Sequence, residues 1–150
     1  MPTLAGVKVL KLPTTELRES VRWYRRVFGA EPVLEFPDIE DGVIRGVALE
    51  LPDADCGIAL REAPEQAAGV RGFNLAVWSV EGLSDIEAWA AHLDKLGIPH
   101  SPTITATQGW MLIFSDPDGI EHHLYTRERH GLDMGHEPRA GRTPAPGAWD

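Results

Sequence analysis

The stretch FSDPDGIEHHLY, residues 114–125, decides the fold of this chain. Its centre, Asp116-Pro117-Asp118-Gly119, has the composition of a tight turn, because proline fixes φ, aspartate carboxylates accept nearby backbone N–H groups and glycine tolerates a positive φ. Apolar runs flank this turn, Trp110–Phe114 before it and Ile120–Tyr125 after it. The stretch therefore predicts a β-hairpin.

The second strand of this hairpin has two different faces, because side chains alternate along a strand. One face holds Glu121, His123 and Tyr125, and the other holds Ile120, His122 and Leu124. We expect the polar face to line a pocket, with simple exposure to water as the alternative. We expect His122 to pack under a helix or at an interface.

Length, charge and cysteine content limit the classes of function. The 150 residues suit a single domain. A net charge of -9 argues against nucleic acid and against an anionic membrane surface as partners. Cys56 is the only cysteine, which excludes an intrachain disulfide and a cysteine zinc cluster. No segment has the pattern of a leader or a membrane span, so the sequence predicts a cytoplasmic protein with a small-molecule partner.

The order strand-helix-strand-strand-strand occurs twice along the chain. Apolar residues at helical spacing predict a first helix over Leu17–Phe28, closed by Gly29. A capping box at Ser84–Glu87 predicts the start of a second helix, which ends at Gly97. Strands are expected over residues 7–12, 33–36, 44–51, 57–61, 73–80, 100–105, 110–114 and 120–125, with a linker over 63–72. Residues 127–150 have the composition of a flexible tail, rich in Gly, Pro and Arg.

This duplicated order, together with Tyr24-Arg25-Arg26-Val27-Phe28-Gly29 and Asp116-Pro117-Asp118-Gly119, resembles the vicinal oxygen chelate superfamily. That superfamily includes glyoxalase I, bleomycin-resistance proteins, fosfomycin-resistance thiol transferases and extradiol dioxygenases. The resemblance implies an α+β fold of two tandem βαβββ modules whose curved sheets surround a cavity. It places one domain over residues 5–126, with modules over about 5–62 and 72–126. It also implies a homodimer, in which modules of two chains sometimes form one site.

In metal-dependent members of that superfamily, the ligands come from the first and last strands of each module. The corresponding positions here are Val9, Arg61, Asn74 and His123. Catalytic metals need about three protein ligands with lone pairs. Valine has none, arginine offers only donors and a fixed positive charge, and asparagine is a weak neutral ligand. We therefore expect no metal cofactor, with a divalent ion held through His123 as the alternative.

A metal-free pocket would be lined by residues that suit a planar or aromatic molecule. We expect ligand contacts from Val9, Lys11, Arg61, Asn74, Trp78, Trp110 and Glu121, and catalytic roles, if any, for His123 and Tyr125. Aromatic walls favour flat ligands, and the two cations favour a carboxylate, phenolate or phosphate. Core packing is an equally ordinary role for Trp78 and Trp110.

Three functions fit these residues. The first is a binding protein for a small, partly aromatic molecule, as in the bleomycin-resistance branch. The second is a metal-independent isomerase, cyclase or lyase, with His123 as the general base and Tyr125 or Arg61 stabilising an oxyanion. The third is a metal-dependent lyase or extradiol dioxygenase with unusual ligands.

Overall fold

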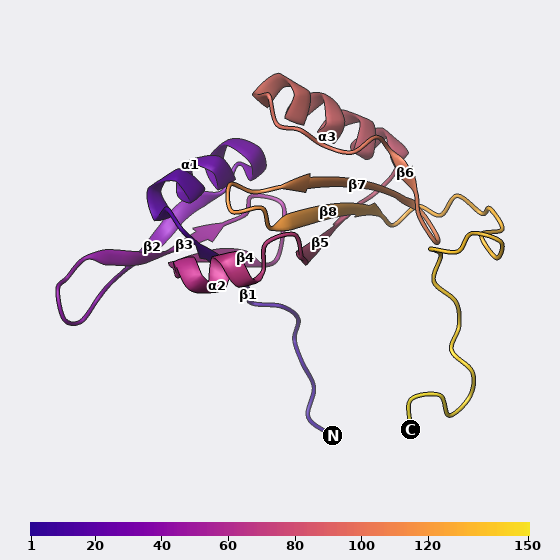
Figure 1. Cartoon of the computed structure of the whole chain (residues 1–150), viewed down its shortest axis with the longest axis horizontal. Helices are drawn as coiled ribbons and strands as arrows, with labels where there is room; N and C mark the ends of the chain where they lie inside the picture. The colour runs from indigo at the N-terminus through magenta and orange to yellow at the C-terminus, as the bar shows by residue number, and fades with distance from the viewer.

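The computed structural model describes residues 1–150 and contains two four-stranded sheets that lie side by side, with α1 and α3 over the same side (Figure 1). The first half of the chain contributes β1 (Val9–Thr14), α1 (Leu17–Phe28), β2 (Glu31–Pro37), β3 (Ile44–Glu50) and β4 (Gly57–Glu62). The short α2 (Pro64–Gly69) leads to the second half, with β5 (Asn74–Val80), α3 (Leu83–Leu96), β6 (Ile104–Thr105), β7 (Trp110–Ser115) and β8 (Glu121–Thr126). We call residues 9–62 the first module and 74–126 the second module.

The two sheets have the same topology. Their strand orders are β1-β4-β3-β2 and β5-β8-β7-β6. In each sheet the first and last strands of the module pair in parallel, and the other pairs are antiparallel. The α+β fold of two tandem βαβββ modules is therefore confirmed.

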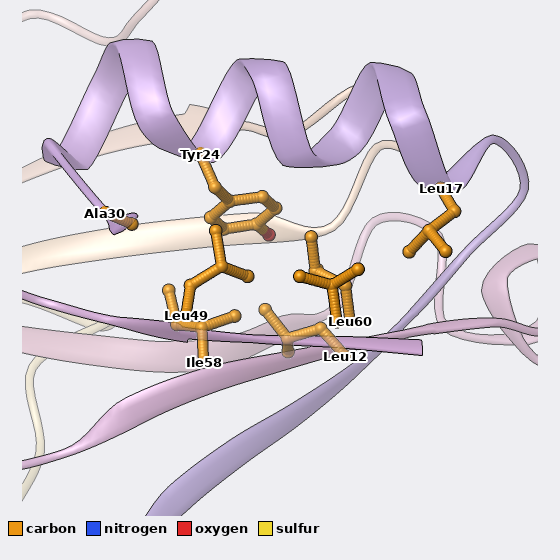
Figure 2. Packing of buried hydrophobic residues seen from close by; sticks show 8 residues of the cluster. Leu12, Leu17, Tyr24, Ala30, Leu49, Ile58 and Leu60 are labelled. Carbon is orange, nitrogen blue, oxygen red and sulfur yellow. The ribbon is translucent and has the colours of Figure 1, made fainter. Parts of the chain in front are cut away.

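One face of the first sheet packs against α1. Leu12, Leu49, Ile58 and Leu60 point from the strands toward the helix, and the buried ring of Tyr24 lies above them (Figure 2). The helix presents this apolar face because its apolar residues recur at helical spacing. It ends at Gly29, whose φ of 64° is the left-handed conformation that glycine adopts most readily.

A second core lies between α3 and the second sheet, and aromatic side chains connect it to the first. It is formed by Val27, Ile86, Leu93, Leu112, Phe114 and Leu124. Trp23, Phe28 and Trp78 are partly buried and pack against both cores. Because α1 carries two of these three side chains, it connects the modules.

The predicted hairpin is confirmed. β7 and β8 pair antiparallel, and the Asp116 N–H donates to the Ile120 carbonyl at 2.9 Å across the turn. Gly119 has a φ of 80°, as the turn requires. Within β8, His122 is fully buried under α1, whereas Glu121 and His123 lie half-buried on the other face.

The structure adds a helix to the expected linker, and two other local expectations were wrong. The linker over 63–72 contains α2, which begins at Pro64, a residue that fits the first turn of a helix. The capping box at Ser84 is not formed, because α3 begins at Leu83 and the Asp85 carboxylate accepts the Gly82 N–H at 2.8 Å. Of the strand expected over 100–105, only the two residues of β6 form a strand, and an isolated antiparallel β-bridge joins His100 to Phe114 before it.

The tail after β8 contains no helix or strand. None of the helices has the length and apolar content needed to cross a membrane.

Candidate functional site

A hollow of about 610 Å³ lies on the face of the first sheet that points away from α1. We call this face the open face. Its floor consists of residues with little or no side chain, Gly46 and Ala48 on β3 and Gly57 and Ala59 on β4. Its walls include Val9, Val33, Leu34, Phe36 and Leu51. The hollow exists because small residues occupy alternate positions of both central strands, where larger side chains would fill it.

Strand register divides the open face into three rows across the sheet. The first row is Val9, Gly57 and Glu50, the second is Lys11, Ala59, Ala48 and Leu34, and the third is Pro13, Arg61, Gly46 and Phe36. Since alternate residues of a strand are about 6.6 Å apart, the hollow has two distinct ends. Glu50 and Asp55 lie at the first-row end, and Lys11 and Arg61 lie toward the third row.

Arg61 lies over the floor of this hollow. A Cβ atom added to Gly46 would be 3.6 Å from the Arg61 guanidinium and 3.5 Å from the Phe36 Cβ. The guanidinium therefore shares the third-row end with an aromatic side chain.

The corresponding face of the second sheet carries the residues predicted to be catalytic. His123 Nε2 lies 3.0 Å from Glu121 Oε1, and their side chains are 14% and 32% exposed. The Tyr125 hydroxyl accepts the N–H of Gln108 at 3.0 Å and that of Gly109 at 3.4 Å. Tyr125 is therefore held by a loop, and the His123–Glu121 pair is the polar group available on this face.

The predicted site residues fall into separate places. Val9, Lys11 and Arg61 line the hollow, whereas Glu121, His123 and Tyr125 belong to the second sheet and do not line it. Asn74 is half-buried in β5 opposite Glu121.

Neither predicted tryptophan lines the hollow. Trp78 points toward the helices and, with Phe28 and Trp89, lines a separate crevice of about 230 Å³. The Trp110 ring meets the His130 ring edge to face, with centroids 5.8 Å apart. The sequence missed Leu34 and Phe36 as wall residues, although the alternating small residues of β3 and β4 were a signal for a hollow facing them.

A buried chain of hydrogen bonds connects the second sheet to α1. Trp78 Nε1–H donates to His122 Nδ1 at 3.1 Å, so the proton of the neutral imidazole is on Nε2 and is donated to the Tyr24 oxygen at 2.9 Å. The Tyr24 hydroxyl donates to Asp116 Oδ2 at 2.8 Å. Both ring nitrogens of His122 thus have hydrogen-bond partners inside the protein, and the ring does not face the hollow.

Burial shifts the pKa of each titratable member of this chain. It lowers the pKa of His122 to about 3, with a smaller effect from the neighbouring His123. Burial also raises the pKa of Asp116, against the hydrogen bond from Tyr24. It raises the pKa of Tyr24 well above the usual value of 10.0, and the Asp116 carboxylate adds to this shift. All three shifts favour the neutral form, as expected where charge is poorly solvated.

The family model of the glyoxalase/bleomycin resistance protein/dioxygenase superfamily matches residues 6–124. The chain belongs to this superfamily. No curated protein matches the sequence.

Several solved structures share the fold of this chain at low sequence identity. A glyoxylase/bleomycin resistance protein/dioxygenase domain from Frankia sp. EAN1pec is 24% identical, with a TM-score of 0.67 over 83% of this chain and 98% of that one. TnmS3, an antibiotic binding protein from Streptomyces sp. CB03234, is 18% identical, with a TM-score of 0.68 over 85% of this chain and 100% of TnmS3. The fosfomycin resistance protein FosX from Listeria monocytogenes is 15% identical, with a TM-score of 0.67 over 84% of this chain and 96% of FosX.

The grouping of possible metal ligands can be compared with that expected of a divalent-ion site. A FosX structure has been solved with Mn(II). Here no three His, Cys, Asp or Glu side chains gather around one point. Of the four positions that the resemblance assigns to ligands, Val9 has no donor atom and Arg61 carries a fixed positive charge, while Asn74 and His123 have lone pairs.

Proposed function

We propose that this protein binds a small, partly aromatic molecule in the hollow of the first sheet, without a metal ion. The observation that carries the proposal is the hollow itself, with apolar walls over a floor of small residues. Its volume of about 610 Å³ lies in the range of sites for drug-sized ligands. The fold shared with the antibiotic binding protein TnmS3 supports a binding role.

Binding of a fluorescent probe, before and after a larger side chain fills the hollow, tests this proposal. The fluorescent, neutral probe N-phenyl-1-naphthylamine should bind the wild-type protein. Ala59→Phe, which adds a ring to the floor, should weaken binding by about tenfold or more, since the ring takes the place of the probe. Ala88→Phe is the matched control, because Ala88 is exposed on α3. Probe binding that is absent, unaffected by Ala59→Phe or abolished by EDTA would contradict the proposal.

The proposed binding unit is a homodimer in which the second module of a partner chain covers the open face. Val9, Val33, Leu34 and Phe36 on the first sheet are 40–59% exposed, and Val77 on the second is 56% exposed. Contiguous exposed apolar side chains of this kind favour an interface. Such pairing would place the His123–Glu121 pair of one chain opposite the hollow of the other. Light scattering should report a dimer, and Phe36→Glu should yield a monomer, whereas a monomeric wild-type protein would contradict this arrangement.

A second candidate is an enzyme that uses His123 as a general base. The observation in its favour is the Glu121 carboxylate, 3.0 Å from His123 Nε2, which can orient the ring and stabilise its protonated form. Mass spectrometry of a bound metabolite should then show conversion by the wild-type protein and none by His123→Gln, which keeps the hollow intact. Recovery of every bound molecule unchanged would favour the binding protein.

A further inference from the structure

We propose that the hollow selects a ligand with an oxyanion group, which lies between Arg61 and Lys11, while its apolar body lies against Leu34 and Phe36. This inference rests on the proposed function and adds the chemical class of the ligand. It concerns the third-row end of the open face, where cations and apolar walls meet.

Register places the two cations as diagonal neighbours on the same face. Lys11 pairs with Ala59 on β4, and Arg61 follows Ala59 by two residues. With strands about 4.8 Å apart and alternate residues about 6.6 Å apart, the two residues start about 8 Å from each other, within reach of one ligand group for two long side chains. Lys8 also lines the hollow. The Arg61 guanidinium lies over Gly46 of β3 and Lys11 comes from β1, so the two cations line the same hollow from either side of Ala59.

Neither cation has a counter-ion within the chain. No carboxylate lies within ion-pair distance of Lys11 or Arg61, whereas Arg45 on the same sheet pairs with Asp38, Asp41 and Glu62. Both cations therefore have free hydrogen-bond donors for a ligand that enters the hollow. An oxyanion of the ligand would neutralise them, and the planar guanidinium is suited to two parallel hydrogen bonds with a carboxylate, phosphate or sulfonate.

The rest of the hollow sets the orientation of such a ligand. At the opposite end the two carboxylates of Glu50 and Asp55 outnumber the one cation, Lys8, and disfavour an oxyanion there. The whole chain carries a net charge of -9, so its overall field disfavours anions and the attraction must come from these local cations. The apolar side chains of Leu34 and Phe36 share the second and third rows with Lys11 and Arg61.

Two fluorescent probes with the same aromatic body test this inference. 8-Anilinonaphthalene-1-sulfonate carries an oxyanion, and N-phenyl-1-naphthylamine lacks it. We expect the sulfonate to bind about tenfold more tightly at low salt, with the advantage lost as salt concentration rises. Arg61→Gln and Lys11→Gln should each remove most of this advantage, because each should weaken binding of the sulfonate several-fold more than binding of the neutral probe. Lys95→Gln, at an exposed cation of α3, should change neither affinity.

The outcomes separate this inference from the proposed function. If both probes bind equally well in wild type and in Arg61→Gln, the hollow binds aromatic molecules but does not select oxyanions. That result would also arise if carboxylates of a second chain neutralised the two cations, and it overturns the inference. If neither probe binds, or if Ala59→Phe does not displace them, the proposed function itself fails.

Discussion

His122 and His123 are adjacent in β8 but have opposite environments, because strand alternation sends one toward α1 and the other away from it. His122 is fully buried between Trp78 and Tyr24, and both ring nitrogens have hydrogen-bond partners. His123 keeps a partly exposed ring beside Glu121. Only the second histidine is therefore available to a ligand.

The hydroxyl of Tyr24 on α1 connects the two modules through hydrogen bonds to Asp116 and His122. Tyr24→Phe removes the donor to Asp116 and the acceptor for His122, and leaves two buried polar groups without this partner. We expect the free energy of unfolding in urea to fall by about 2–3 kcal/mol. Tyr125→Phe is the control, since its hydroxyl accepts N–H groups of a loop at the surface, and it should cost about 1 kcal/mol or less. Equal losses in the two variants would contradict the role given to Tyr24.

The lowered pKa of His122 also predicts how the free energy of unfolding depends on pH. Its pKa falls from the usual 6.5 to about 3 in the folded protein, so between these values the unfolded chain binds a proton that the folded protein does not. The free energy of unfolding should therefore decrease as pH falls below about 6.5, by up to about 1.4 kcal/mol per pH unit. The raised pKa of Asp116 acts in the opposite direction nearer its usual value of 3.8.

Urea unfolding between about pH 7 and 5 measures this effect, and His122→Gln should remove the contribution of His122 to the slope. Nuclear magnetic resonance of the wild-type His122 ring checks the same pKa directly. A ring that becomes protonated near pH 6 would show that the prediction is wrong.

Among the helices and strands, the sequence predicted both long helices and the hairpin correctly, but it placed the first residue of α3 wrongly. Apolar spacing and the terminal glycines Gly29 and Gly97 identify both long helices, because these signals are local. The start of α3 depends on a residue far along the chain: Glu128 accepts the Leu83 N–H at 3.0 Å. A Cβ atom on Gly82 would lie 2.6 Å from that carboxylate, so a larger residue at this position would displace the Glu128 side chain. No pattern within residues 82–87 contains this partner.

Glu128 is therefore expected to stabilise α3 from outside the helix. Glu128→Ala leaves the Leu83 N–H without its acceptor and removes a negative charge from the helix N-terminus. We expect a loss of about 1 kcal/mol in the free energy of unfolding, measured by circular dichroism during thermal unfolding. Glu87→Ala, at an exposed position of the same helix, should change stability by about half of that or less. Equal effects would show that Glu128 does not cap the helix.

At the scale of the whole molecule, the candidate site was predicted in part. The family resemblance indicated Val9 and Arg61, and these residues line the hollow together with Lys11. It also grouped them with residues of the second sheet, such as His123. Hydrophobic periodicity gives the faces of each sheet but not the way in which two sheets meet, because that depends on side chains such as Trp23 and Phe28 between the cores.

Phe28 is the side chain with which the coupling of the two modules can be tested. It packs against both cores and contacts the rings of Trp78 and Trp89, with centroids 5.5 Å and 5.6 Å away. Phe28→Ala should cost about 3 kcal/mol and should separate the unfolding of the two modules, because it opens a cavity between them.

Tryptophan fluorescence reports mainly on the second module, which contains Trp78, Trp89 and Trp110, whereas far-ultraviolet circular dichroism reports on both modules. The two transitions should coincide in wild type and diverge in Phe28→Ala. Val21→Ala is the control, since Val21 packs against the first core alone, and it should lower stability while the transitions still coincide. Coincident transitions in Phe28→Ala would mean that the modules unfold together without this contact, and that the hydrogen bonds of Tyr24 suffice to couple them.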